Sequence, residues 1–165
     1  MGDCFEVYLI SQHYISYARL LPLYSILGEN AKIYKSKIYN NWTMSGGESV
    51  TSEAPISARL DNGCIIKCDG LLDNLHRIGI YQYKETNDYI HQIWIDSDHL
   101  PFLDSGNCSL EIKELCDSLV VLIDELFGDD HIKFFAAGCE TIFEYSDRYE
   151  DITSLSHNLI YSHVF

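Results

Sequence analysis

Residues 109 to 127 read SLEIKELCDSLVVLIDELF, and this stretch carries the most regular hydrophobic pattern in the sequence. Its apolar side chains recur every three or four residues, which is the spacing of one face of an α-helix. Ser109 is a candidate N-cap, and Gly128 is a candidate C′ residue. Glu111 and Glu114 lie in the first turns, where the helix dipole favours acidic side chains. The pattern therefore predicts an amphipathic helix over 109–127.

The segments around this helix include short runs of β-branched and aromatic residues, a composition typical of strands. Residues 77–96 predict one hairpin, around the turn-type residues 85–88. Residues 56–68 predict another, because Asn62-Gly63 favours the positive φ angles of a type I′ turn. The strands expected from these patterns are 4–10, 56–60, 64–68, 77–84, 89–96, 131–137, 140–145 and 159–165.

Three further segments have weaker patterns. Residues 13–27 fit a helix loosely, with Pro22 kinking it after the first turns and Gly28 capping it. Residues 31–39 hold three lysines and no turn former, which indicates an exposed or edge strand. Residues 40–55 are rich in Asn, Gly, Ser and Thr, which predicts a loop rather than a linker between domains.

These elements predict the fold class. Neighbouring strands joined by tight turns form antiparallel pairs, whereas a parallel sheet would need more crossover helices than the sequence offers. We therefore expect a single α+β domain over residues 1–165. Its mainly antiparallel sheet packs against the helix at 109–127 and a second helix near 13–27.

The composition fits one globular domain and excludes two kinds of partner. The chain has 165 residues, of which 47% are hydrophobic, and a net charge of −14 from 25 acidic and 11 basic side chains. A charge of this sign argues against binding to nucleic acid phosphates or to an anionic membrane surface. No apolar run approaches the roughly 18 residues that a membrane span needs.

The six cysteines are expected to be reduced, because the sequence opens without the basic and long apolar regions of a secretory signal. We therefore expect a cytoplasmic protein, in which a cysteine between apolar neighbours is a small buried side chain. Cys64 and Cys68 lie on one face of a predicted strand and could touch one metal ion. Their spacing is not that of a zinc site and no second pair follows, so no metal site is predicted.

Two short groups place carboxylates beside an imidazole, as a metal-dependent or general acid–base site would. They are DSDH at 96–99 and DDH at 129–131. Both follow a predicted strand or helix, where turn and cap residues have the same composition. The sequence has no Gly-x-Ser-x-Gly, no phosphate-binding glycine loop and no dinucleotide fingerprint. We therefore expect that the protein is not an enzyme and has no cofactor.

The acidic side chains concentrate in the second half of the chain. Residues 1–83 carry 8 acids and 7 bases, a net charge of −1, whereas residues 84–165 carry 17 acids and 4 bases, a net charge of −13. Such a surface can simply keep a protein soluble. It can also attract a basic partner, because a field of one sign speeds association and adds complementarity at an interface.

Residues 140–151 combine five acids with Phe143, Tyr145 and Tyr149. In a charge-steered protein interface the aromatic groups supply burial and the acids supply steering. The same alternation of polar and apolar residues would also fit an ordinary half-buried strand. The candidate partner-binding residues are Asp96, Asp98, Glu140, Glu144, Tyr145, Asp147, Tyr149, Glu150 and Asp151.

In size, acidity, fold class and its segment 140–151, the chain resembles the cytosolic immunity proteins of bacterial polymorphic toxin and contact-dependent inhibition systems. This resemblance is one of overall character and transfers no individual binding residue. It implies a monomer or homodimer that binds one cognate toxin domain, often a basic nuclease, and occludes it during bacterial competition.

Two other functions stay open on the sequence. A phage-encoded inhibitor of the anti-CRISPR kind would use carboxylates as substitutes for nucleic acid phosphates. It would need regular rows of acids, whereas Lys32, Lys35, Lys37 and Arg59 leave the first half nearly neutral. A small enzyme or ligand-binding domain would need a deep pocket with perturbed titratable groups.

Overall fold

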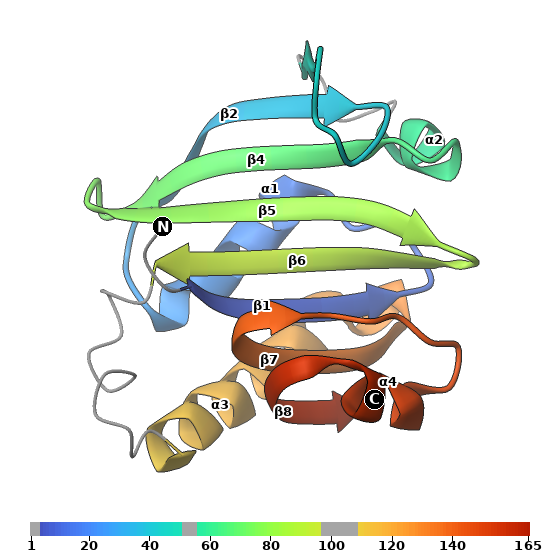
Figure 1. Ribbon diagram of the computed structural model, residues 1–165. Helices are drawn as coiled ribbons and strands as arrows, with labels where there is room; N and C mark the ends of the chain where they lie inside the picture. The colour runs from blue at the N-terminus through green and yellow to red at the C-terminus, as the bar shows by residue number, and fades with distance from the viewer. Residues whose placement is uncertain (1–3, 51–55, 97–108) are drawn as a thin grey trace.

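The computed structural model describes residues 4–50, 56–96 and 109–165 (Figure 1). Eight strands of this part of the chain form one sheet in the order β3-β2-β4-β5-β6-β1-β7-β8, and every neighbouring pair is antiparallel. The strands are β1 (Cys4–Ser11), β2 (Ala31–Tyr39), β3 (Glu48–Ser49), β4 (Ile65–Leu72), β5 (His76–Glu85), β6 (Asp88–Asp96), β7 (Ile132–Ile142) and β8 (His157–Val164). The predicted antiparallel α+β fold is therefore confirmed.

The predicted amphipathic helix is confirmed with the same bounds, as α3 (Ser109–Phe127). Its buried side chains recur every three or four residues, among them Ile112, Cys116, Ile123 and Phe127. They join the main hydrophobic cluster on one face of the sheet. This face is formed by the alternate strand residues that point toward α3, because successive side chains of a strand point to opposite faces.

The segment predicted as a helix near 13–27 is helical in two short pieces. The helix α1 (Tyr17–Leu20) continues into the 3₁₀ helix η1 (Leu21–Ile26). Pro22 lies in the first turn of η1, where its missing N–H leaves no lost hydrogen bond. Both pieces lie behind the sheet on the same side as α3 (Figure 1).

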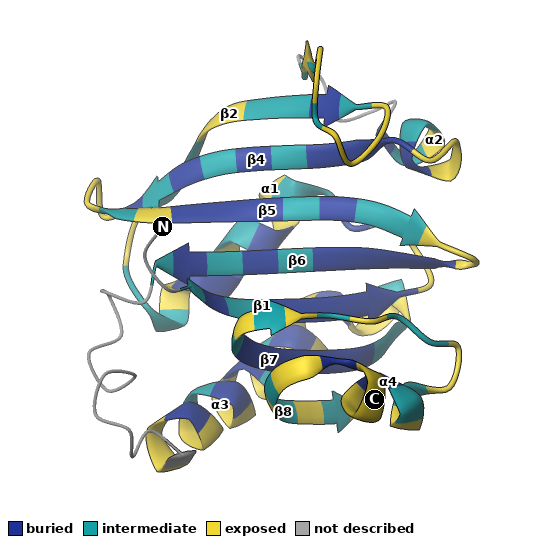
Figure 2. Ribbon diagram, viewed as in Figure 1, coloured by how far each residue is buried: buried dark blue, intermediate teal, exposed yellow. Residues whose placement is uncertain are grey.

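The other face of the sheet is covered only in part. The helix α4 (Tyr149–Leu155) packs there over a small cluster that includes Ile10, Phe134 and Ile152. In front of β4, β5 and β6, by contrast, no helix of the described residues lies, although side chains on these strands are largely buried or half-buried (Figure 2). The part of this face that no helix among the described residues covers is called the open face below.

The hairpin predicted at 56–68 is wrong, because residues Ile56–Asp61 form the helix α2. Ile56 and Leu60 are fully buried one helical turn apart, so core packing favours the helix. Gly63 has a φ of 86° and ends the helix. Its N–H donates to the Leu60 carbonyl and the Cys64 N–H to the Arg59 carbonyl, which is a Schellman motif. Asn-Gly therefore caps a helix here.

The two strands predicted at 131–137 and 140–145 are one strand, β7, which ends at Ile142. Its pairing with β8 shifts register near Gly138, so the strand continues through an irregularity that the sequence pattern marks as a break. The predicted C′ role of Gly128 is also wrong. This residue begins the one-turn 3₁₀ helix η4 (Gly128–Asp130), and His131, with a φ of 54°, is the left-handed residue that follows.

The predicted hairpin at 77–96 is confirmed by β5 and β6, which pair from Glu85 and Asp88 onward. The predicted strand 31–39 is confirmed as β2, which pairs with β4 along its length and with the short β3 only at Lys37 and Ile38. Most of β2 therefore lies at the edge of the sheet. In the loop that follows, the Trp42 ring contacts the rings of two tyrosines of β5. Residues 51–55 of the predicted loop lie outside the described residues.

A buried polar network joins β1, β5 and β6. The Gln82 Nε2 group lies 2.8 Å from His91 Nδ1 and donates to the Ile15 carbonyl at 2.6 Å. His91 Nδ1 therefore accepts, so its Nε2 carries the proton and donates to Ser11 Oγ at 2.8 Å. Ser11 Oγ donates in turn to the His13 carbonyl. Each of these buried groups has a partner, as burial of polar atoms requires.

Candidate functional site

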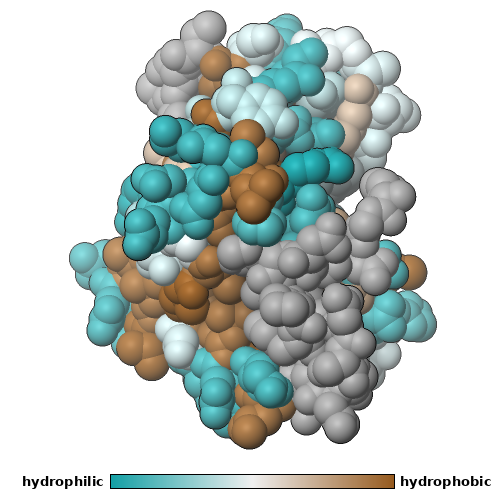
Figure 3. Space-filling model, turned by 90° about the vertical axis from the view of Figure 1, so that its left-hand side faces the viewer, coloured by the Kyte–Doolittle hydropathy of each residue, from teal (hydrophilic) through white to brown (hydrophobic). Residues whose placement is uncertain are grey.

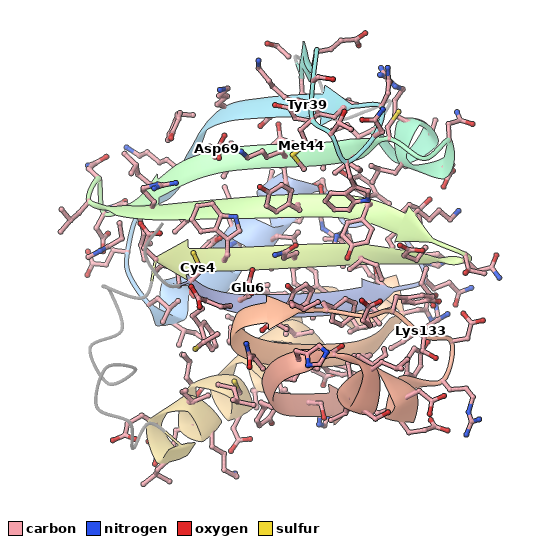
Figure 4. The ribbon with its side chains drawn as sticks, viewed as in Figure 1. Cys4, Glu6, Tyr39, Met44, Asp69 and Lys133 are labelled. Atoms are coloured by element: carbon pink, nitrogen blue, oxygen red, sulfur yellow. The ribbon has the colours of Figure 1, made fainter. Side chains whose placement is uncertain are left out.

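The open face contains a hollow of about 380 Å³, which is within the size range of ligand pockets. Its lining comes from β4, β5, β6 and β1, which lie side by side in that order, and from the end of β7. Figure 4 shows Asp69 of β4 on the same face as Cys4 and Glu6 of β1. The described lining residues are Cys4, Glu6, Lys67, Asp69, Arg77, Tyr81, Gln92, Trp94, Asp96, Glu140 and Thr141.

Charge is divided across this hollow. The cationic side chains among its described lining residues are Lys67 on β4 and Arg77 on β5. Three of its four carboxylates, Glu6, Asp96 and Glu140, lie on the neighbouring strands β1, β6 and β7. The exception is the Asp69 carboxylate on β4, which pairs with the Lys67 ammonium at 3.8 Å. The hollow therefore has a basic end and an acidic end.

Trp94 forms the floor between the two ends. It pairs across the hairpin with Gly79, and a Cβ atom at Gly79 would lie only 2.4 Å from the indole ring. The ring therefore lies over the backbone of β5, in the space that a side chain would fill. From the opposite face, the buried Tyr24 Oη donates toward the carbonyl oxygens of both Gly79 and Trp94, at 3.0 and 2.9 Å. The Arg77 guanidinium lies 5.9 Å from the ring centroid.

Glu6 is the most constrained carboxylate of the acidic end. Its Oε1 accepts from Gln92 Nε2 at 2.9 Å and its Oε2 from the Thr141 N–H at 2.6 Å. Burial nevertheless raises the pKa of Glu6 above its usual value, and the nearby Glu140 carboxylate adds to this, while the two hydrogen bonds act in the opposite direction. A carboxylate that is half-buried, although burial disfavours its charged form, is a candidate functional group.

Replacing Glu6 with Gln is expected to leave the protein at least as stable at pH 7. The raised pKa means that the folded state disfavours the charged form, so this contribution is favourable at low pH and is lost as the pH rises through the folded pKa. The neutral variant lacks that penalty, and it keeps both contacts if its amide oxygen accepts from the Thr141 N–H and its amide NH2 donates to the Gln92 amide oxygen after that amide turns round. Urea denaturation at pH 7 and pH 4 measures the difference: the advantage of the variant should shrink at pH 4. A variant less stable than wild type at pH 7 would contradict this.

Two of the nine residues predicted to bind a partner line this hollow. Asp96 lies at the end of β6, where Cys4 Sγ is 3.9 Å from its carboxylate, and Glu140 lies near the end of β7. Glu140 has a φ of 47°, a left-handed backbone that is uncommon for a residue with a side chain. The structure thus brings Asp96 and Glu140 together beside Glu6. Asp98 lies outside the described residues.

The other six candidates lie along 144–151, and several contact their own fold. Tyr145 Oη donates to Asp88 at 2.8 Å, and Asp88, only 4% exposed, also binds Lys133 Nζ at 2.5 Å. The Tyr149 ring stacks on Phe134. Burial and the two neighbouring carboxylates raise the pKa of Tyr145. These tyrosines therefore hold the segment against the sheet, and its exposed residues are mainly the acids. The remaining candidates in this segment are Glu144, Asp147, Glu150 and Asp151.

The lining residues that were not predicted from the sequence include Glu6, Lys67, Arg77 and Trp94. Each is the partly exposed or exposed member of a strand whose alternate residues are buried. That alternation is visible in the sequence, but it occurs on four strands, and only the order of the strands in the sheet brings these positions together.

A second hollow, of about 270 Å³, lies beside α1 and η1 and is lined by residues that include Leu21, Pro22 and Gly28. An apolar crevice between η1 and α3, lined by residues that include Leu23, Leu27 and Leu119, holds only about 20 Å³. Figure 3 shows apolar side chains at the surface of the end of the molecule where β1 begins. Cys64 and Cys68 are buried in the main hydrophobic cluster, as expected of small apolar side chains. Within the described ranges, no three His, Cys, Asp or Glu residues are grouped to hold a metal ion.

None of the helices among the described residues is both long and apolar enough to cross a membrane. Comparisons of this chain with protein-family models, with curated proteins and with solved structures found no match.

Proposed function

We propose that this chain is a protein-binding inhibitor of the immunity-protein kind, which neutralises a basic toxin domain such as a nuclease by occluding it. One observation carries the proposal: Asp96 and Glu140, far apart in the sequence, meet Glu6 at the acidic end of a hollow with an aromatic floor. Carboxylates around a partly exposed indole suit a long cationic side chain, which gains both charge pairing and contact with the ring.

The charge of the whole chain supports the same partner. A net charge of −14 steers a basic domain toward this surface and raises the association rate at low ionic strength. The exposed acids of 144–151 lie on the side of the sheet that α4 covers, which is also the side of the open face. We infer that they add to the steering around the hollow.

Charge reversal at Asp96 is expected to weaken binding more than the same change elsewhere. The variant Asp96→Lys is compared with Asp147→Lys combined with Glu150→Lys, and with Asp124→Lys, an exposed position on α3 across the sheet. Each variant is used to capture proteins from lysate of the source cells, and the affinity of the recovered basic domain is measured at low and high salt. We expect a loss of at least about tenfold for Asp96→Lys, roughly 1.4 kcal/mol.

The control Asp124→Lys changes the net charge by the same amount as Asp96→Lys, so it reports the general effect of charge. Equal losses for the two variants would show that the hollow is not the contact site. Recovery of no basic protein by the wild-type chain, at either salt concentration, would contradict the inhibitor function itself. Circular dichroism of each variant checks that the fold is kept.

The nucleic acid mimic is less well supported by this site. Carboxylates that replace phosphates would meet a groove built for anions, where Lys67 and Arg77 in the middle of the open face would be repelled. A hollow with both signs of charge favours a protein partner whose surface also carries both.

A further inference from the structure

We propose that the hollow receives a dipolar peptide segment, with a basic side chain at its acidic end and an acidic side chain at its basic end. This inference rests on the proposed function and names the part of the partner that enters the site. It differs from simple attraction between an acidic protein and a basic one, because it gives the cations of the hollow a role in binding.

The register of the strands places the charges in a defined order. Trp94 lies between Gly79 on β5 and Glu6 on β1, with which it pairs directly. Asp96 pairs with Cys4 of β1 and, as the register of Ile78 with Ile95 continues, lies opposite Arg77 of β5, so the acidic end borders the basic end at β6. Because β5 and β1 are two strands apart, the strands that hold Arg77 and Glu6 lie about 10 Å apart, twice the spacing of roughly 4.8 Å between strands.

The Arg77 guanidinium is suited to an anion from outside. It is exposed, it lies beside an aromatic ring, and it forms no ion pair with another described residue. Among these residues Lys67 has only the long contact with Asp69 and the face of the Tyr81 ring. A planar guanidinium can bind a carboxylate with two parallel hydrogen bonds. The basic end thus offers a guanidinium that pairs with no carboxylate among the described residues.

An extended segment of the partner fits this separation. Residues two positions apart on such a segment point to the same side, about 7 Å apart, and their side chains extend the reach to the two ends of the hollow. The indole floor then contacts the stem and guanidinium of the basic side chain. A segment with cations only would meet repulsion from Arg77 at the basic end.

Short blocked peptides test this inference without knowledge of the partner. The probes are acetyl-GRSEG-amide, which is dipolar, and the matched peptides acetyl-GRSQG-amide and acetyl-GQSEG-amide, each with one charge. Binding to the full chain is followed by NMR through the indole N–H of Trp94, assigned with a Trp94→Phe variant. We expect GRSEG to bind about tenfold more tightly than either single-charge peptide, with dissociation constants in the millimolar range.

The variant Arg77→Gln distinguishes the dipolar ligand from a cationic one. Loss of Arg77 should reduce the affinity for GRSEG to that for GRSQG, whereas Lys113→Gln, the same charge change on α3, should leave the peptide order unchanged. An increase in GRSEG affinity with Arg77→Gln would overturn the inference, because removal of a cation helps a purely cationic ligand. Equal binding of GRSEG and GRSQG to wild type, or no shift of Trp94 up to about 10 mM peptide, would also overturn it.

The peptide experiment tests the ligand of the hollow, and the capture experiment tests the inhibitor function, so one proposal can fail without the other. If GRSEG keeps its advantage but no basic domain is recovered, the ligand class of the hollow stands and the inhibitor function fails. If a basic domain is recovered whose binding depends on Asp96 while GRSEG has no advantage, the inhibitor function stands and the dipolar segment is wrong.

Discussion

At pH 4 the protein is expected to have lost about 3 kcal/mol of its free energy of unfolding relative to pH 7 through one side chain, His91. His91 is completely buried, and this burial lowers the pKa of its imidazole from about 6.5 to about 3, against a smaller opposite effect of the Asp130 carboxylate. The effect is large because burial strongly disfavours the protonated imidazole in the folded state.

The sign follows from the two protonation states. Below a pH of about 6.5 the unfolded chain binds a proton at His91, whereas the folded chain does not bind it until the pH approaches about 3. Stability is therefore present in full above pH 6.5 and is lost as the pH falls through this window. Burial is the main cause, and protonation would also break the hydrogen bond that Nδ1 accepts from Gln82.

A His91→Asn variant isolates this effect from the other titrating groups. The Asn side chain accepts a hydrogen bond at a position similar to that of Nδ1, but it cannot be protonated in this range. We expect the variant to be less stable than wild type at pH 7 and to lose no further stability at this position on acidification. Urea denaturation at pH 7, 5.5 and 4 should show the gap between the two proteins narrowing by about 3 kcal/mol. A gap that stays constant would mean that His91 is not the group responsible.

The second large effect is expected for Gly79→Ala. The new Cβ atom would lie 2.4 Å from the Trp94 indole, which is far inside van der Waals contact. The backbone cannot easily yield, because Tyr24 Oη holds the carbonyl groups of both residues from the other face. The ring must therefore leave the floor of the hollow. We expect a loss of about 1 to 3 kcal/mol in stability, as for other overpacked sites, and at least about tenfold weaker binding of GRSEG.

Denaturation, tryptophan fluorescence and the peptide titration measure the three consequences of Gly79→Ala. The matched control is Gly128→Ala, where a Cβ atom meets nothing within 4 Å, so that variant should keep wild-type stability and binding. Combining Gly79→Ala with Trp94→Leu should recover part of the stability without restoring peptide binding. The smaller side chain removes the clash, but it does not restore the aromatic floor of the hollow. Unchanged fluorescence and binding in Gly79→Ala would show that the ring does not depend on Gly79.

The local patterns in the sequence determine much of the fold. The period of the apolar residues in α3 is visible over five helical turns, and the β5–β6 hairpin has two apolar runs around a polar turn. Such signals depend on neighbouring residues alone, so no tertiary contact is needed to read them. The α2 segment shows the opposite case: Asn-Gly has the same local preference in a hairpin and at a helix end, and only burial of Ile56 and Leu60 decides between them.

The candidate site depends on tertiary structure to a greater degree. The sequence shows that acids gather in the second half of the chain, and it points to Asp96 and Glu140. It does not show that β1 lies between β6 and β7, which places Glu6 of the first strand beside both. Strand order depends on contacts between residues far apart in the chain, so local composition carries no information about it. The division of the hollow into a basic and an acidic end is therefore a product of the sheet.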